Sequence, residues 1–284
     1  MSGCVLMDGK ALSAKIRQNI KAEVEYLKSN IDCVPGLAVV LVGNDPASEI
    51  YVRNKEKACA EVGFTSKKIV LSESISEEEL LAVINELNCD NTIHGILVQL
   101  PLPAHINKDK VIESIATEKD VDIFKTDSMG KLFEGVHCIA PCTPSGIMAL
   151  LDEYNVDLEG KHCVVVGRSN IVGKPIAMML MQRNATVTIC HSKTKDLEKF
   201  CKMADVIVCA VGKTDLITDD MIKDGVVIVD VGINRNSEGK VCGDVNIVDK
   251  DKVSYMTPVP GGVGPMTITM LLQNTLILFK ENLV

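Results

Sequence analysis

The sequence contains no tryptophan and few other aromatic residues, with five phenylalanines and four tyrosines among 284 residues. Basic residues are also outnumbered, because 30 Lys and Arg stand against 38 Asp and Glu and give a formal net charge of −8. Proteins that read nucleic acids usually present a basic face and rings on which bases stack. The composition therefore argues against a nucleic-acid partner.

Long apolar runs are absent as well. No segment approaches the roughly 18 consecutive apolar residues that a membrane-spanning helix needs. The opening MSGCVLMDGK lacks a basic stretch followed by an apolar core, so it does not resemble a signal peptide. We therefore expect a cytoplasmic protein with no membrane partner.

The eleven cysteines include no C-x-x-C pair. The closest two, Cys138 and Cys142, have no histidine at a zinc-finger distance, so we expect no metal site. Cys163, Cys190 and Cys209 lie inside apolar runs, which is typical of small buried thiols in a reducing compartment.

Hydrophobic residues are plentiful, at 46%, and they alternate between two patterns. Continuously apolar runs are typical of parallel strands covered on both faces. They lie at 37–42, 67–71, 94–100, 162–167, 186–191, 205–211 and 226–231. Amphipathic helical patterns lie at 11–28, 46–62, 76–88, 107–116, 143–154, 173–183, 197–203, 218–224 and 264–280. This alternation predicts an α/β fold.

The pattern is interrupted at 138–145, which predicts a domain boundary there. Thr143 is the expected N-cap of the next helix, with Pro144 in its first position. Four predicted strands follow within about 70 residues, as in a mononucleotide-binding unit. We predict one α/β domain over 1–140, completed by the C-terminal helix 264–284, and a Rossmann-type domain over 141–263.

A glycine loop follows the predicted strand 162–167. Gly167, Arg168 and Ser169 begin this loop, and Gly173 opens the next helix. Backbone N–H groups and a helix N-terminus can face a pyrophosphate in this arrangement, with Arg168 and Ser169 as additional donors. The spacing differs from G-x-G-x-x-G, so an ordinary strand–helix turn remains an alternative.

The end of the next predicted strand indicates which dinucleotide would bind. NAD sites usually carry an acidic residue there, which binds the ribose 2′-hydroxyl. Here the strand ends in His191 and Ser192 followed by Lys193, without an acid. Hydroxyls and cations suit a 2′-phosphate, so the pattern favours NADP. The alternative for His191 is a surface residue that closes the strand.

Tyr51 and Lys55 lie four residues apart in the predicted helix 46–62, so they share one helical face. A tyrosine ring can stack on a flat heterocycle while the ammonium reaches its edge. By spacing alone, such a pair more often belongs to a solvated helix face.

Five segments together resemble the bifunctional methylenetetrahydrofolate dehydrogenase/cyclohydrolase family, in order and spacing. They are PASEIYVRNKEKACAEVGF at 46–64, GILVQLPLP at 95–103, PCTPSG at 141–146, GRSNIVGKP at 167–175 and PVPGGVGPMT at 258–267. The resemblance implies a homodimer that oxidises 5,10-methylenetetrahydrofolate with NADP and hydrolyses the methenyl product to 10-formyltetrahydrofolate. It also implies an active-site cleft between the two domains.

The resemblance assigns roles to individual residues. Lys55 matches the catalytic lysine, Gln99 its hydrogen-bond partner, and Tyr51 the ring that stacks on the folate. Asp122 matches the carboxylate that binds the pteridine. The remaining substrate-binding candidates are Ser48, Leu100, Pro260, Gly261 and Gly262. The cofactor-binding candidates are Gly167, Arg168, Ser169, Gly173, His191, Ser192 and Ile233.

These roles agree with the chemistry of the two steps. Hydride transfer needs mainly the alignment of two rings. Hydrolysis needs a group that titrates near neutrality. A lysine buried beside a cationic substrate has a lowered pKa, which makes Lys55 the candidate general base or proton relay.

The segment 120–130 departs from the family pattern, which has glycine at position 123 and asparagine at 128. Here these positions hold Ile123 and Ser128. A β-branched residue resists positive φ, so we expect an altered loop around Asp122. A monofunctional dehydrogenase with weak hydrolysis therefore remains an alternative. A non-catalytic binder of folate or NADP is the second, although a binder does not need Lys55.

Overall fold

The computed structural model describes residues 3–136 and 139–283, and Cys138 lies outside them. The chain divides into two compact units. The six-stranded unit comprises Met1–Ser13 and Thr143–Thr267, and the three-stranded unit comprises Ala14–Cys142 and Ile268–Val284. The division falls within α1 (Gly9–Ile31), at the start of α6 (Cys142–Glu153) and within α9 (Val263–Glu281).

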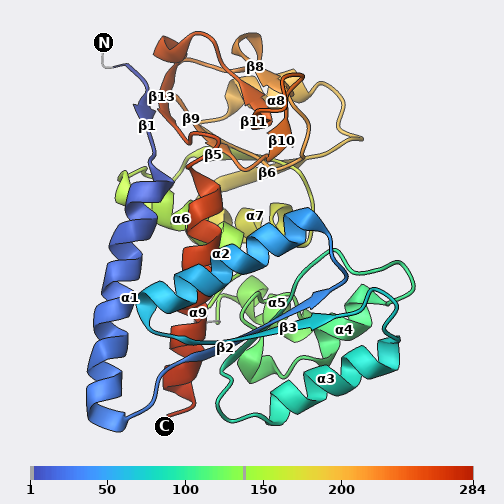
Figure 1. Ribbon diagram of the computed structural model, residues 1–284. Helices are drawn as coiled ribbons and strands as arrows, with labels where there is room; N and C mark the ends of the chain where they lie inside the picture. The colour runs from blue at the N-terminus through green and yellow to red at the C-terminus, as the bar shows by residue number, and fades with distance from the viewer. Residues whose placement is uncertain (1–2, 137–138, 284) are drawn as a thin grey trace. The chain divides into compact units, whose positions relative to one another are not determined.

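The three-stranded unit is built on a parallel sheet in the order β3-β2-β4. The strands are β2 (Gly36–Val42), β3 (Thr65–Leu71) and β4 (Gly95–Val98). Every residue of the central β2 is buried. Its alternate side chains Ala38, Val40 and Val42 belong to a core cluster that includes residues of α3 (Glu77–Cys89) and α4 (Lys108–Ser114). Figure 1 shows α2 (Pro46–Val62) along the opposite face of this sheet.

The two residues Asp45 and Pro46 specify where the helix α2 begins. Asp45 is its N-cap and accepts a hydrogen bond of 2.8 Å from the Ser48 N–H, while Pro46 occupies the first helical position. The helix ends at Gly63, whose φ of 83° suits a residue without a side chain. Tyr51 and Lys55 both lie within these bounds and are four residues apart, so they share one face of the helix.

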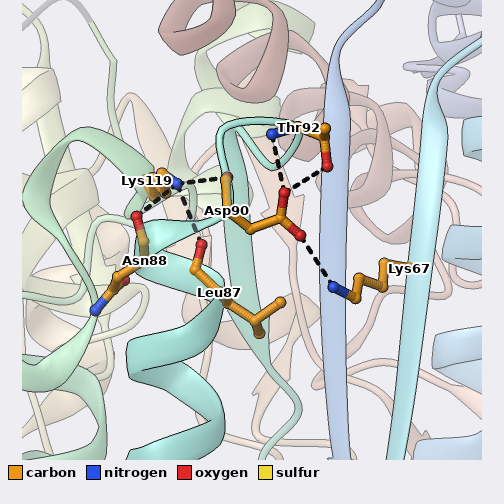
Figure 2. A network of polar contacts seen from close by, with 6 residues as sticks. All are labelled: Lys67, Leu87, Asn88, Asp90, Thr92 and Lys119. Atoms are coloured by element: carbon orange, nitrogen blue, oxygen red, sulfur yellow. Dashed lines mark hydrogen bonds and ion pairs between the residues drawn. The ribbon is translucent and has the colours of Figure 1, made fainter.

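A buried lysine fastens the end of α3 to the segment that leads to Asp122 (Figure 2). The Lys119 ammonium donates three hydrogen bonds of 2.8–3.1 Å to the carbonyl oxygens of Leu87, Asn88 and Asp90. A cation suits the carbonyl oxygens at a helix C-terminus, which carry the negative end of the helix dipole. Hydrogen bonds from Thr92 and Lys67 hold the pKa of the Asp90 carboxyl well below its usual range.

The main sheet of the six-stranded unit is parallel, with its strands in the order β1-β13-β9-β7-β5-β6. The strands are β1 (Val5–Leu6), β5 (His162–Val166), β6 (Thr186–Cys190), β7 (Val206–Cys209), β9 (Val226–Asp230) and β13 (Val253–Met256). Counted from β5, this is the doubly wound order 2-1-3-4-5, whose switch point lies between β5 and β7. The helices α7 (Gly173–Gln182) and α8 (Leu197–Met203) connect successive strands.

Two local predictions are wrong. No α-helix forms at 218–224; β8 (Ile217–Thr218) is followed by a 3₁₀ turn, Asp219–Met221. Ile217 and Ile222 both enter the core, and a spacing of five does not fit one helical face. Thr143 is not an N-cap, because α6 begins at Cys142 and the Thr143 hydroxyl instead bonds that of Thr267 at 3.0 Å.

Several elements have no counterpart in the sequence prediction. They are β1, β13, α5 (Thr126–Glu134) and the short strands β10 (Asn234–Arg235), β11 (Val241–Cys242) and β12 (Val245–Asn246), together with the 3₁₀ turns Thr117–Lys119 and Lys250–Lys252. The strand β1 lies in the range predicted for the first domain, yet it pairs with β13 in the six-stranded unit. Two exposed residues carry no periodicity, so only the pairing defines this strand.

The prediction of buried thiols is confirmed, since Cys163, Cys190 and Cys209 are each 0% exposed. The ten cysteines among the described residues are free thiols. Within residues 3–136 and 139–283, no helix combines the length and apolar character required to cross a bilayer.

Candidate functional site

The three-stranded unit brings together residues that are far apart in the sequence. The partly buried Lys55 of α2 donates a hydrogen bond of 2.7 Å from Nζ to Oε1 of Gln99. Gln99 follows directly after β4, and its Nε2 donates to the Leu100 carbonyl at 2.7 Å. The two bonds of the amide fix its orientation, so its carbonyl oxygen faces the lysine.

Two groups of this cluster have pKa values that are shifted toward neutral pH. Burial lowers the pKa of Lys55, although the charge of the Asp122 carboxylate opposes this effect. Burial also raises the pKa of Asp122 to about 6, against the opposing charge of Lys55. The expected depression of the lysine pKa by desolvation is confirmed in direction. The pKa values of Lys55 and Asp122 are therefore closer to each other than those of an exposed lysine and an exposed aspartate.

Cys142 and Asn274 complete the surroundings of Asp122, and the sequence assigned a role to neither. The Cys142 thiol donates to the Val121 carbonyl at 3.4 Å, and the same carbonyl accepts a bond of 2.9 Å from the Asn274 amide. Burial and the neighbouring carboxylate of Asp122 raise the pKa of Cys142 well above its usual value. The thiol is therefore neutral and acts as packing and as a weak donor.

The loop after Asp122 does not follow the sequence expectation. Ile123 adopts a φ of +57°, so the expectation that a β-branched residue would avoid the left-handed region is wrong. Its N–H donates to Asp120 Oδ1 at 3.0 Å, and the buried hydroxyl of Ser128 donates to Oδ2 at 3.2 Å. The left-handed conformation costs about 1–2 kcal/mol. Complete burial of the Ile123 side chain contributes a similar amount, about 1.5–3 kcal/mol, in the opposite sense.

The surface around the cluster contains the remaining folate candidates of this unit. Tyr51 is 44% exposed, which leaves its ring available for stacking. Ser48 is buried in the first turn of α2, where its N–H donates to the side chain of the N-cap Asp45. A small pocket lined mainly by apolar groups borders Asp122. Its lining includes Leu100, Ile112, Asp120 and Phe124.

In the six-stranded unit, the loop after β5 approaches the loop after β7 closely. A Cβ at Gly167 would lie 2.4 Å from the Ala210 carbonyl oxygen, and a Cβ at Gly173 would lie 2.4 Å from the Gly167 carbonyl oxygen. Only glycine permits these approaches without movement of backbone. The two loops therefore border the switch point of the sheet.

Three N–H groups at the start of α7 are hydrogen-bonded to Ser169. The Ser169 hydroxyl oxygen accepts from the N–H groups of Val172 and Gly173, at 3.1 and 3.3 Å. The Ser169 carbonyl accepts from the Lys174 N–H at 3.0 Å, and Pro175 has no N–H. In this conformation, the exposed Arg168 side chain and the Ser169 hydroxyl hydrogen are among the donors available to a phosphate.

The end of β6 forms a tight turn beside this loop, since the Gly167 N–H donates to the Cys190 carbonyl at 2.8 Å. The His191 N–H donates to Thr194 Oγ1 at 2.8 Å, and the Lys193 N–H donates to His191 Nδ1 at 3.1 Å. This arrangement exposes Ser192 and Lys193 with no carboxylate in the turn. A hydroxyl and a cation suit a phosphate group.

The other candidates of the six-stranded unit lie in two further loops. Ile233, after β9, is 57% exposed. Pro260, Gly261 and Gly262 precede α9, where Gly261 accepts a bond of 3.0 Å from the Lys10 N–H and Gly262 donates to Pro258 at 2.8 Å. The predicted site residues are thus divided between the two units, and the cleft expected between the units stays a prediction.

A doubly wound parallel sheet with a glycine-bordered switch point defines a nucleotide-binding α/β protein. The lysine–glutamine–aspartate cluster on a second α/β unit adds a group suited to proton transfer. Two family models match the chain. Residues 7–122 match the tetrahydrofolate dehydrogenase/cyclohydrolase catalytic domain, and residues 141–283 match the NAD(P)-binding domain of the same family. The chain belongs to the tetrahydrofolate dehydrogenase/cyclohydrolase family.

Individual relatives agree with this assignment. Bifunctional protein FolD of Streptococcus pyogenes serotype M28 is 57% identical over 271 residues, which are 95% of each chain. The bifunctional FolD structure from Campylobacter jejuni is 53% identical with a TM-score of 0.96, covering 98% of this chain and 99% of that one. The Trypanosoma brucei FolD structure, complexed with NADP cofactor and inhibitor, is 36% identical with a TM-score of 0.94 over 100% and 99% of the two chains.

Proposed function

We propose that this protein oxidises 5,10-methylenetetrahydrofolate to 5,10-methenyltetrahydrofolate with NADP and hydrolyses that product to 10-formyltetrahydrofolate. The family assignment and the bifunctional relatives support both activities. The observation that carries the hydrolytic half is the Lys55–Gln99 hydrogen bond of 2.7 Å beside Asp122.

In the hydrolytic step, water adds to the cationic one-carbon bridge and a C–N bond then breaks, with release of one proton. Burial lowers the pKa of Lys55 and so favours its neutral amine, whose Nζ can accept a proton from the attacking water. The Gln99 carbonyl orients this amine. In the alternative role of a proton relay, Lys55 Nζ first accepts a proton and then donates it.

The role that we propose for Asp122 is to bind the substrate. With a pKa of about 6, its carboxyl is mainly ionised at pH 7. An ionised carboxylate accepts two donors from the aminopyrimidinone edge of the pterin. The exposed Tyr51 ring on the same helical face as Lys55 is proposed to stack on the heterocycle, with Ser48, Leu100, Pro260, Gly261 and Gly262 as the other substrate contacts.

NADP supplies an acceptor for the hydride when it is bound. The residues of the six-stranded unit fit such a cofactor, because Gly167 and Gly173 allow close approach of backbone and the turn after β6 has no carboxylate. We propose that Arg168, Ser169, His191, Ser192 and Ile233 hold it. Their task is to orient the dinucleotide, since hydride transfer depends mainly on alignment.

We further propose that the protein acts as a homodimer in the cytoplasm. The family resemblance supports this assembly, and light scattering on the purified chain would test it. A monomer at assay concentrations would contradict it.

The reaction is tested by mixing the purified protein with 5,10-methylenetetrahydrofolate and NADP. We expect NADPH to appear and methenyltetrahydrofolate to be hydrolysed faster than in buffer alone. Accumulation of methenyl absorbance with no accelerated decay would instead identify a monofunctional dehydrogenase. Cofactor binding without NADPH formation would identify a non-catalytic binder.

A further inference from the structure

Two aspartates in the six-stranded unit are buried, and the proposed reaction assigns neither a role. Asp230, the last residue of β9, is 2% exposed, and Asp244, between β11 and β12, is 0% exposed. Buried carboxylates are rare unless they are well supplied with hydrogen-bond donors. Their donors therefore show what these two side chains hold in place.

Asp244 binds the loop that follows β7. Its Oδ2 accepts from the N–H groups of Val211 and Gly212, at 2.7 and 3.0 Å, and its Oδ1 accepts from the N–H of Lys213 at 2.8 Å. Oδ1 also accepts from the Asn234 amide at 2.8 Å, which links this loop to the one after β9. Three consecutive N–H groups thus converge on one carboxylate.

Asp230 holds Asp244 in turn. Its Oδ1 accepts from the N–H groups of Asp244 and Gly232, at 2.9 and 3.0 Å, and its Oδ2 accepts from the Val245 N–H at 3.0 Å. A Cβ at Gly232 would lie 2.1 Å from Asp244 Oδ1, and a Cβ at Gly243 would lie 1.8 Å from Asp230 Oδ2. The backbone is therefore packed directly against both carboxylates and has little room to shift.

The loop held by Asp244 lies at the switch point of the sheet. It follows β7, next to the β5 strand that leads to Gly167, and Ala210 at its start contacts the Gly167 position. Ligands of doubly wound sheets bind in the crevice outside the carboxyl ends of the strands at this point. Val211, Gly212 and Lys213 are all exposed there, as is Ile233 after β9.

We propose that Asp244 is a positioning residue for the nicotinamide nucleotide. Its carboxylate holds the backbone of 211–213 and, through Asn234, the loop that carries Ile233, in the conformation against which the cofactor binds. The inference rests on the proposed function and deepens it, because it concerns the same cofactor. Asp244 itself faces backbone donors, so it is not a catalytic residue.

The test uses Asp244→Asn in the full-length protein. The asparagine keeps the shape, but its NH2 group must face two N–H donors in either orientation, so the loop loses part of its anchor. We expect the KM for NADP, and its Kd by calorimetry, to rise at least tenfold. Hydrolysis of methenyltetrahydrofolate uses no NADP and should remain within twofold of the unchanged protein.

Asp219→Asn is the matched control. Asp219 lies in the same unit, directly after β8, and accepts two backbone bonds of 3.0 and 2.8 Å from Val248 and Asp249, which belong to none of the loops after β5, β7 and β9. We expect both activities of this variant to stay within twofold.

Two results would overturn the inference. One is a Kd for NADP of Asp244→Asn within twofold of the unchanged protein. The other is an equal loss of both activities, since that indicates a general defect of folding. An unchanged protein that binds NADP without reducing it would reject the proposed reaction alone, because the binding comparison would still decide the role of Asp244.

Discussion

Replacing Lys55 with methionine separates the two proposed chemistries. Methionine is also unbranched and retains most of the apolar stem, but it lacks the amine that donates to Gln99 at 2.7 Å. Hydrolysis requires a group that exchanges a proton, whereas hydride transfer depends on the alignment of two rings. The variant should therefore lose hydrolysis while part of the dehydrogenase activity survives.

The magnitude follows from the role of the amine. General acid–base catalysis contributes about 10²–10⁴-fold, which corresponds to about 3–5 kcal/mol of the barrier. We expect hydrolysis to fall by at least about 100-fold. The dehydrogenase loses only part of the substrate positioning, which we place at up to about tenfold, or about 1.4 kcal/mol.

The assay follows NADPH formation and the decay of methenyl absorbance in separate experiments. Lys57→Met is the matched control, because Lys57 lies on the same helix with an exposed side chain. Both activities of the control should stay within twofold. Hydrolysis by Lys55→Met within threefold of the unchanged protein would refute the proposed role of the amine.

Three further substitutions test other parts of the structure. Ser192→Asp places a carboxylate in the turn after β6 and should raise the KM for NADP at least tenfold, while the KM for NAD changes little. Ser192→Asn is the neutral control. Equal weakening of the binding of both cofactors would contradict the placement of the 2′-phosphate. Burial raises the pKa of Asp230 to about 6, so protonation stabilises the folded state fully below about pH 4, and this contribution is lost as pH rises through about 6. The free energy of unfolding of the unchanged protein relative to Asp230→Asn should therefore fall by about 2 kcal/mol between pH 4 and 7, and a flat difference in denaturant titrations would contradict the burial effect. Lys119→Met removes three hydrogen bonds at the end of α3 (Figure 2) and should lower the free energy of unfolding by about 2–4 kcal/mol. Urea titrations should show a change within about 0.5 kcal/mol for the exposed control Lys108→Met, and a loss below about 1 kcal/mol for Lys119→Met would show that water replaces its bonds.

Local signals in the sequence determined much of the fold. The helix α2 has the predicted bounds, because Asp45 and Pro46 specify its start and the next few residues decide its period. The central strands of both sheets were also recognisable as continuous apolar runs, since both of their faces are covered. Tyr51 and Lys55 share a face for the same local reason.

Contacts between distant segments were decided only by the tertiary structure. Gln99 meets Lys55 across 44 residues, and the shifted pKa values of Lys55 and Asp122 arise from the surrounding atoms rather than from sequence neighbours. Ile123 occupies the left-handed region because three-dimensional burial and the Asp120 carboxylate stabilise it there.

The same distinction explains why motifs located the candidate site but could not describe its support. The hydrogen bonds between Asp244 and the N–H groups of residues 211–213 join segments about 30 residues apart. No characteristic spacing in the sequence indicates them. Periodicity and caps depend on neighbours within a few residues, so a sequence displays them directly. Hydrogen bonds, burial and strand pairing depend on which distant segments the sheet order brings together, and only the folded chain determines that order.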